Sequence, residues 1–360
     1  MENERAPSSS TALPVCARLG STGKGETVKG RIFSGMRPSG RLHLGNYLGA
    51  LQNWVALQDE YSCIYCAVDV HALTDMQGES TRDIQPNIRE MVLDWLAAGI
   101  DPEKSIVFVQ SHVPEVMILH TLLSMVTPLG WLMRVPTFKE KVRQMHETEE
   151  TVSYGLVGYP VLMTSDIILY KADTVPVGED QIPHLELARE IARRFNYLYS
   201  PTFPEPQAKL TEYPLIQGLD GKQKMSKSLD NHVELAATPE ETTARVRTAF
   251  TDPQRLRRSD PGRPWVCNVY TLHKYFNPDR LEEVYQKCTT AQIGCVEDKL
   301  LLAEGINRVL EPFRERRRGL VGKKGYVQEV LREGASRAQA IARETLAEVR
   351  EKLHISEATL

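Results

Sequence analysis

The 360-residue sequence lacks the features that mark membrane and secreted proteins. It has no stretch of about eighteen uncharged apolar residues, so no helix that spans a bilayer is predicted. Cysteine is scarce, and six residues are too few for a disulfide scaffold, which favours a reducing cytoplasm. A strong excess of one charge is also missing. The formal net charge of −3 gives no overall attraction to a polyanion, so contact with nucleic acid would depend on local basic patches.

The N-terminal segment lacks the apolar core of a signal peptide. It carries serine, glycine, proline and charges of both signs, which predicts a disordered tail over residues 1–29. A mitochondrial transit peptide is the alternative. Glu2, Glu4 and Glu26 disfavour it, because transit peptides are poor in acidic residues.

What the sequence does contain is a regular alternation of strand and helix patterns. Residues 31–35 predict a short strand that ends at glycine, and apolar residues at helical spacing follow from Leu44 to Leu57. The same alternation continues through predicted segments at Cys63–Val68, Ile84–Ala98, Ile106–Val109, Tyr159–Tyr170, Thr174–Val177 and Gln181–Phe195. Such alternation predicts a parallel sheet covered by helices, reaching to about residue 200.

Strand patterns fade after a proline-rich connector at residues 201–206. Helical periodicity then predicts helices at Pro239–Phe250, Leu281–Lys287, Val296–Arg318 and Ser336–Leu353. The predicted fold class is α/β: a Rossmann-like parallel-sheet catalytic domain over residues 30–230 and an all-helical C-terminal domain over residues 231–355. The last helix could pack back on the catalytic domain.

The segment from Pro38 to Asn46, PSGRLHLGN, lies where the first predicted strand turns into a helix. Ligands bind at such turns in parallel sheets. Glycines allow close approach of the backbone to a phosphate, and the free N–H groups at a helix N-terminus attract anions. Taken alone, the segment fits a nucleotide site and a plain structural turn equally well.

A second segment, Lys224–Ser228 or KMSKS, lies among glycines and lysines without periodicity, which predicts a mobile basic loop. Two lysines in such a loop can close over a triphosphate and offset the charge that develops as pyrophosphate leaves. Alone, the pentapeptide is more typical of a solvated surface loop. Together, His43–Asn46 and Lys224–Ser228 resemble the paired motifs of class I aminoacyl-tRNA synthetases, in the same order and on the same elements.

The segment from residue 159 to residue 181 resembles the bacterial-type tryptophanyl-tRNA synthetases. Tyr159, Met163 and Asp166 are spaced to share one face of a helix. An indole ring is an apolar plate with one N–H donor, so aromatic and thioether walls with one acceptor suit it, and Asp166 is the expected acceptor. On an isolated helix the same residues would more often be ordinary core and a salt-bridge partner. The nearest alternative is a tyrosyl-tRNA synthetase, whose comparable helix in bacterial members carries glutamine in place of Met163.

The resemblance covers about residues 30–355 and implies a ligase that activates L-tryptophan with ATP and Mg²⁺ and transfers it from the adenylate to tRNA(Trp). It further implies a cytoplasmic homodimer without membrane association. The implied catalytic residues are His43, Lys141, Lys224 and Lys227. The implied ATP contacts are Arg37, Pro38, Ser39, Gly45, Asn46, Gly178, Glu179, Asp180, Leu215, Lys224, Met225, Ser226, Lys227 and Ser228. The implied tryptophan contacts are Phe33, Tyr159, Met163, Asp166, Val175, Val177 and Gln181.

The chain departs from the family pattern at several positions. Arg37 and Thr137 replace glutamines that are common beside the ATP, and Arg37 could pair with a phosphate. Leu229-Asp230-Asn231 follows the lysine loop where Asp-Pro is common. A non-catalytic paralogue that binds tryptophan or a protein therefore stays open. A nucleotidylyltransferase that ignores tRNA also stays open, although the helical domain disfavours it.

Other candidate ligands have weaker support. Cys267, Cys288, Cys295 and Asp298 match the spacing at which some tryptophanyl-tRNA synthetases hold a [4Fe–4S] cluster, with aspartate in place of the fourth cysteine. A degenerate site without metal is the favoured alternative. His71, His112, His120 and His184 form no metal spacing and are interpreted as structural. The basic residues Arg314, Arg316, Arg317, Arg318, Lys323 and Lys324 fit a tRNA-binding face and a solvated helix end equally well.

Overall fold

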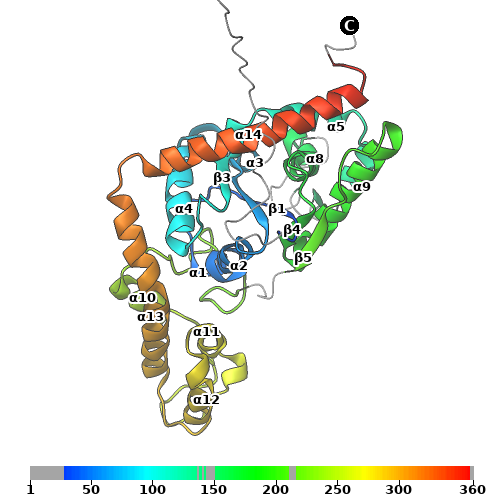
Figure 1. The fold of residues 1–360 in the computed structure, drawn as a ribbon. Helices are drawn as coiled ribbons and strands as arrows, with labels where there is room; N and C mark the ends of the chain where they lie inside the picture. Colours follow the sequence, from blue (N-terminus) through cyan, green and yellow to red (C-terminus); the bar gives the residue numbers. More distant parts are fainter. Residues whose placement is uncertain (1–27, 136–137, 140–141, 143–150, 211–215, 357–360) are drawn as a thin grey trace, which may run out of the picture.

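The chain forms a five-stranded parallel sheet in the order β3-β2-β1-β4-β5 (Figure 1). The computed structural model describes residues 28–135, 138–139, 142, 151–210 and 216–356. The strands are β1 (Arg31–Met36), β2 (Ser62–Ala67), β3 (Ile106–Val109), β4 (Thr174–Val177) and β5 (Gln207–Leu210). From β1 the chain adds β2 and β3 on one side of the sheet, and then β4 and β5 on the other side, so the direction changes between β1 and β4. In open parallel sheets, ligands bind in the crevice at such a switch point, outside the carboxyl ends of the strands.

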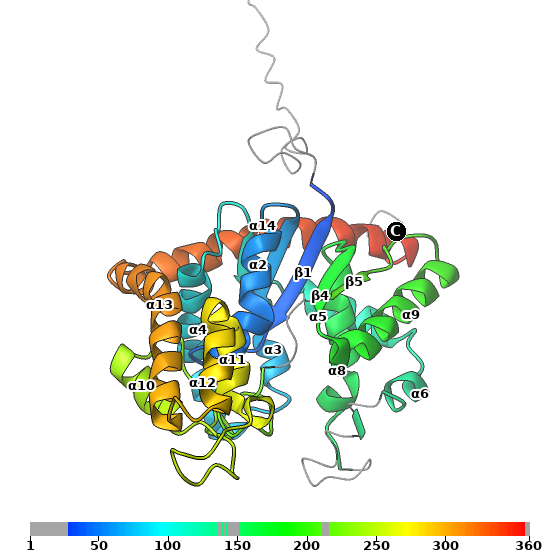
Figure 2. The same cartoon turned by 90° about the horizontal axis from the view of Figure 1, so that it is seen from below.

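Helices fill the connections between the strands and cover both faces of the sheet (Figure 2). After β1 the chain forms α1 (Leu44–Asn46), the π-helical turn η2 (Tyr47–Leu51) and α2 (Gln52–Leu57). The other helices of this part are α3 (Asp69–Ala72), α4 (Ile84–Ala98), α5 (Glu115–Ser124), α6 (Leu129–Leu132), α8 (Tyr154–Ile168) and α9 (Ile182–Leu198).

Two apolar cores lie on opposite faces of the sheet, because side chains alternate along each strand. Ile32 and Cys63 belong to the core beneath α2 and α4, whereas Phe33 and Cys66 belong to the core beneath α5, α8 and α9. The two cysteines therefore point to opposite faces of the sheet, and each belongs to an apolar core. With both faces covered, the strands β2 and β3 are apolar on both sides, which explains their nearly continuous apolar sequence.

The C-terminal part is helical. Its helices are α10 (Pro239–Arg247), α11 (Asn268–Phe276), α12 (Leu281–Thr289), α13 (Cys295–Val321) and α14 (Tyr326–Lys352). Helix α13 begins at the end of the helical part that carries α11 and α12, and it runs back to the sheet domain, where it packs on α4 (Figure 1). Helix α14 then packs across the sheet at β3. At Gly334 a Cβ atom would come within 1.9 Å of the Val107 carbonyl oxygen, so only glycine allows α14 to pack directly on β3.

The predicted α/β class, with a parallel sheet and helical C-terminal part, is confirmed. Several elements were not predicted, namely the helices α3, α5, α6 and α11 and the edge strand β5, which extends the sheet beyond residue 200. Strand β5 is largely exposed and polar and is held by backbone pairing with β4, so its sequence carries little strand pattern. None of the helices within the described ranges combines the length and apolar character needed to cross a membrane. The predicted tail at residues 1–29 lies almost wholly outside the described residues.

Candidate active site

A cavity of about 1040 Å³ lies at the carboxyl ends of β1 and β4, where the topology places a ligand site. Its walls come from several separate parts of the chain, including both predicted motifs. The predicted site residues that line it are Phe33, Arg37, Gly45, Asn46, Tyr159, Met163, Asp166, Val175, Val177, Gly178, Glu179, Asp180, Gln181 and Lys224. The fold therefore brings residues of the predicted nucleotide and amino-acid sites together around one cavity.

Other predicted site residues do not line the cavity. These are Pro38, Ser39, His43, Met225, Ser226, Lys227 and Ser228. Lys141 and Leu215, predicted to contact ATP, and Thr137, noted as a departure, lie outside the described residues.

His43 and Gly45 form the contact between the first motif and the lysine loop. The His43 ring is buried, and burial, followed by the nearby His232, Lys227 and Lys224, lowers its pKa to about 3. The ring is therefore neutral near pH 7 and can donate one N–H. A Cβ atom at Gly45 would lie 3.1 Å from the His43 ring and 3.2 Å from the Met225 Cβ atom, so glycine allows this close packing.

Asn231 holds the lysine loop in shape. The Ser226 N–H donates to its Oδ1 at 2.7 Å, and its Nδ2 donates to Asp220 Oδ2 at 2.9 Å and to the Lys224 carbonyl oxygen at 3.2 Å. Because Asn231 is buried, these contacts fix the backbone on both sides of Met225. In the sequence, Asn231 stands out only as part of a departure from the family pattern.

Two cations of the site have protein partners. The Lys227 ammonium donates to the Ser39 carbonyl oxygen, which joins the lysine loop to the first motif. Burial lowers the pKa of Lys227, as expected for a lysine in a partly enclosed site. Arg37, the predicted phosphate partner, forms an ion pair with Asp75 while it lines the cavity.

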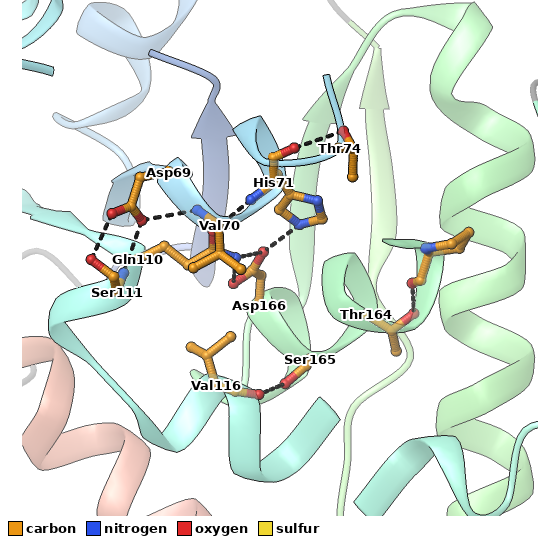
Figure 3. A network of polar contacts seen from close by, with 11 residues as sticks. Asp69, Val70, His71, Thr74, Gln110, Ser111, Val116, Thr164, Ser165 and Asp166 are labelled. Carbon is orange, nitrogen blue, oxygen red and sulfur yellow. Dashed lines mark hydrogen bonds and ion pairs between the residues drawn. The ribbon is translucent and has the colours of Figure 1, made fainter. Parts of the chain in front are cut away.

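Asp166 carries a buried carboxylate at one wall of the cavity, with 2% of the residue exposed. It contacts His71 Nε2 at 3.0 Å and accepts from Gln110 Nε2 at 2.8 and 2.9 Å (Figure 3). The Gln110 Oε1 atom accepts from the N–H groups of Val70 and His71, so its amide must turn Nε2 toward Asp166. Neither partner was predicted from the sequence. His71, which was interpreted as structural, lines the cavity.

The remaining walls are largely apolar or aromatic. The Phe33 ring stacks on Tyr170 with centroids 5.6 Å apart, and Met163 lines the cavity on the same helix as Asp166. The Tyr159 hydroxyl lies 3.3 Å from Nε2 of His184, a second cavity residue interpreted as structural from the sequence. A flat apolar ligand with one N–H donor fits such walls.

The cysteine group does not fit an iron–sulfur cluster. The Arg255 Nη1 atom lies 3.7 Å from the Cys288 sulfur and 3.8 Å from the Cys295 sulfur, so a cation occupies the space between them. The carboxylate of Asp298, the candidate fourth ligand, contacts His273 Nε2 at 3.1 Å. Within the described ranges no group of three metal-ligating side chains is arranged to hold a metal ion. The suggested [4Fe–4S] site therefore has no structural support.

Comparisons with known proteins agree with this geometry. Residues 26–311 match the family model of class I tRNA synthetases for W and Y. The tryptophan–tRNA ligase of Thermotoga maritima is 45% identical over 90% of this chain and 99% of its own length, and that of Aquifex aeolicus is 40% identical over 90% and 100%.

A solved structure shows the same likeness. It is the tryptophanyl-tRNA synthetase of Campylobacter jejuni complexed with ADP and tryptophan, which superposes with a TM-score of 0.80 at 33% identity over 90% of this chain and 99% of its own. The chain therefore belongs to the class I tRNA synthetase family that comprises the tryptophan and tyrosine enzymes.

Proposed function

We propose that this chain is a tryptophan–tRNA ligase, which activates L-tryptophan with ATP and transfers it to tRNA(Trp). The observation that carries the substrate assignment is the single buried carboxylate of Asp166 in a wall that also contains Phe33 and Met163. An indole N–H needs one acceptor and its ring needs apolar contact, and these residues supply both. The relatives named tryptophan–tRNA ligase support the same assignment.

Tyrosine fits these walls less well. The phenol hydroxyl of tyrosine would require a hydrogen-bond partner in the site. Met163 offers only a thioether, which is a weak acceptor and has no donor. A hydroxyl buried without a partner costs about 1–3 kcal/mol. Phenylalanine has no N–H for Asp166, and the carboxylate would lose an expected donor. The tyrosine-specific alternative is therefore disfavoured by Met163 and Asp166 together.

The reaction would take place in two steps. An oxygen of the tryptophan carboxylate attacks the α-phosphorus of Mg·ATP, the bond to the bridging oxygen breaks, and pyrophosphate leaves. A ribose hydroxyl at the tRNA terminus then attacks the carbonyl carbon of the adenylate, and AMP leaves. In this scheme no covalent bond to the protein forms, so the protein would act by positioning the reactants and by electrostatic stabilisation.

Residues of the two motifs would supply that stabilisation. Lys224 lines the cavity, and Lys227 already reaches the first motif through Ser39, so either ammonium can meet the phosphates by a small movement of the loop. His43 would donate a neutral N–H, because its low pKa keeps the ring uncharged. Gly178, Glu179 and Asp180, at the turn between β4 and α9, would hold the nucleotide from the opposite wall.

The tRNA would contact the helical C-terminal part, although the arginine run contributes less than its sequence suggests. Arg314 is buried, the Arg316 Nε donates to the Ala97 carbonyl oxygen at 2.6 Å, and Arg317 pairs with Asp94. These three side chains therefore have partners within the protein. Arg318, Lys323 and Lys324 are exposed and remain suitable for phosphate contacts.

A homodimer would cover an apolar surface on α5, α6 and α8. Ile118, Met125, Leu129 and Tyr154 expose large apolar side chains there, with Met125 76% exposed. Such a patch favours contact with protein, and a second copy of the chain is the partner we propose. A cytoplasmic setting agrees with the described cysteines Cys63, Cys66, Cys267, Cys288 and Cys295, all of which are free thiols.

The experiment that tests the proposed function is ATP–pyrophosphate exchange with tryptophan, tyrosine and phenylalanine compared in parallel. Exchange that depends on tryptophan alone is expected. Exchange with tyrosine would transfer the assignment to the tyrosine enzymes. The absence of exchange with any amino acid, in a folded protein, would favour a non-catalytic paralogue.

A further inference from the structure

Arg317 links helix α13 to the catalytic sheet beside the first motif. Its Nε donates to Asp94 Oδ1 at 2.7 Å and its Nη2 to Glu90 Oε2 at 2.6 Å, so the planar guanidinium holds two carboxylates of α4. The Asp94 side chain is completely buried and that of Arg317 nearly so. A buried ion pair of this kind fixes geometry more than it adds net stability.

The second oxygen of Asp94 holds the backbone of the nucleotide motif. The Leu42 N–H donates to Asp94 Oδ2 at 2.8 Å, and Leu42 directly precedes His43. On the other side of this segment, the Leu235 N–H donates to the Leu42 carbonyl oxygen at 2.9 Å, and the Leu44 N–H donates to the Val233 carbonyl oxygen at 3.0 Å. Residues 42–44 are therefore held between α4 and the segment that follows the lysine loop.

Glu90 completes the connection. It accepts from Arg317 and also from the Arg41 Nε at 3.2 Å, and Arg41 in turn lies 3.7 Å from a carboxylate oxygen of Glu234. Arg41 and Leu42 are thus both bound, through α4 carboxylates, to the same guanidinium.

We infer that Arg317 is a positioning residue for the nucleotide site, which acts through Asp94 on the backbone at Leu42 and His43. This inference rests on the proposed function. Loss of the guanidinium would leave Asp94 as a buried carboxylate without its cation, and the carboxylate would move or take up a proton. Either change alters the contact to Leu42, and a displacement of about 1 Å at a phosphate-contacting group can cost about 100-fold in rate. The nucleotide site is then complete only when α13 lies against α4.

A merely structural role for Arg317 predicts a different result, and Arg316 provides the matched control. Arg316 joins the same two helices through its contact with the Ala97 carbonyl oxygen, but in the described part of the chain it forms no hydrogen bond or ion pair with Asp94, Glu90 or the nucleotide motif. If Arg317 only fastens α13 to α4, then Arg316→Met and Arg317→Met should have similar effects.

The experiment uses the full chain and measures tryptophan-dependent ATP–pyrophosphate exchange at varied ATP and at varied tryptophan. For Arg317→Met we expect kcat/KM for ATP to fall about tenfold or more, and KM for tryptophan to change less than about twofold. For Arg317→Lys, whose single ammonium cannot form the planar fork, we expect a fall of about threefold. For Arg316→Met we expect both constants to stay within about twofold of the wild type. Thermal unfolding of each variant shows how much of its change is structural.

The inference is overturned if folded Arg317→Met keeps the wild-type kcat/KM for ATP, or if Arg316→Met lowers it equally. If Arg317→Met does not fold, Arg317→Lys decides, and a wild-type kcat/KM for ATP in that variant overturns the inference. These outcomes differ from failure of the proposed function, in which the wild-type chain itself shows no exchange with tryptophan.

Discussion

Substitution of Asp166 by asparagine tests the amino-acid site most sharply. Both carboxylate oxygens lie within 3.0 Å of the Gln110 Nε2 atom, and one of them also contacts His71 Nε2. The Gln110 amide cannot turn over, because its Oε1 accepts from the N–H groups of Val70 and His71. An asparagine at position 166 would therefore direct its NH₂ group at the Gln110 NH₂ group in one orientation or the other, because both carboxylate positions face that donor. It would also offer tryptophan a neutral acceptor in place of a charged one.

The magnitude follows from the lost charge. A hydrogen bond to a charged group contributes about 1.5–3 kcal/mol, which corresponds to about 10- to 150-fold in kcat/KM. We expect Asp166→Asn to lower kcat/KM for tryptophan by that factor in pyrophosphate exchange, with KM for ATP within about twofold of the wild type.

The matched control is Asp69→Asn. Asp69 is buried nearby and accepts from Ser111 Oγ at 2.6 Å (Figure 3). It does not line the cavity. This variant should lose stability in thermal unfolding and keep KM for tryptophan. The reasoning is refuted if Asp166→Asn retains kcat/KM for tryptophan within about twofold, or if Asp69→Asn loses as much.

Four further outcomes are expected. Because burial lowers the pKa of His43 to about 3, against about 6.5 when unfolded, its neutral ring stabilises the fold above pH 6.5, and this contribution is lost as pH falls toward 3. By pH 5 the loss is about 2 kcal/mol. In urea unfolding, the free energy of unfolding of His43→Asn should therefore fall less between pH 7 and pH 5 than that of the wild type. An equal fall in the two proteins would contradict the low pKa of His43. Asn231→Ala should release the lysine loop and lower kcat for exchange about tenfold or more, with KM for tryptophan nearly constant. An unchanged kcat would show that the loop holds its shape without Asn231. Reconstitution with iron and sulfide should give no cluster absorbance, because the Arg255 cation lies between two of the sulfurs, whereas retained iron that disappears in Cys288→Ser would reinstate a metal site. Met125→Arg should convert a dimer into monomers in analytical ultracentrifugation, and a dimer that survives the change would place the interface elsewhere.

Local patterns account for what the sequence predicted correctly. The strands β1 to β4 are apolar on both faces, so their sequences alone predict buried strands. Tyr159, Met163 and Asp166 lie on one helix, and their spacing is enough to place them together on the cavity wall.

Contacts between distant segments account for what the sequence did not predict. His71 and Asp166 are 95 positions apart, and no periodicity relates them. The arginine run on α13 looks like a solvated basic face, yet Arg317 finds its carboxylate partners on α4, more than 200 positions earlier. Only the packing of α13 against α4 gives these charges their partners.

The central claim is that this chain joins tryptophan to tRNA, and its most direct test is aminoacylation. Purified protein would be incubated with ATP, Mg²⁺ and radiolabelled tryptophan or tyrosine, with tRNA(Trp) and tRNA(Tyr) transcripts compared, and acid-precipitable label would be counted. The account predicts charging of tRNA(Trp) with tryptophan and no charging of tRNA(Tyr) with tyrosine. Charging with tyrosine, or a folded protein that charges neither tRNA, would contradict it.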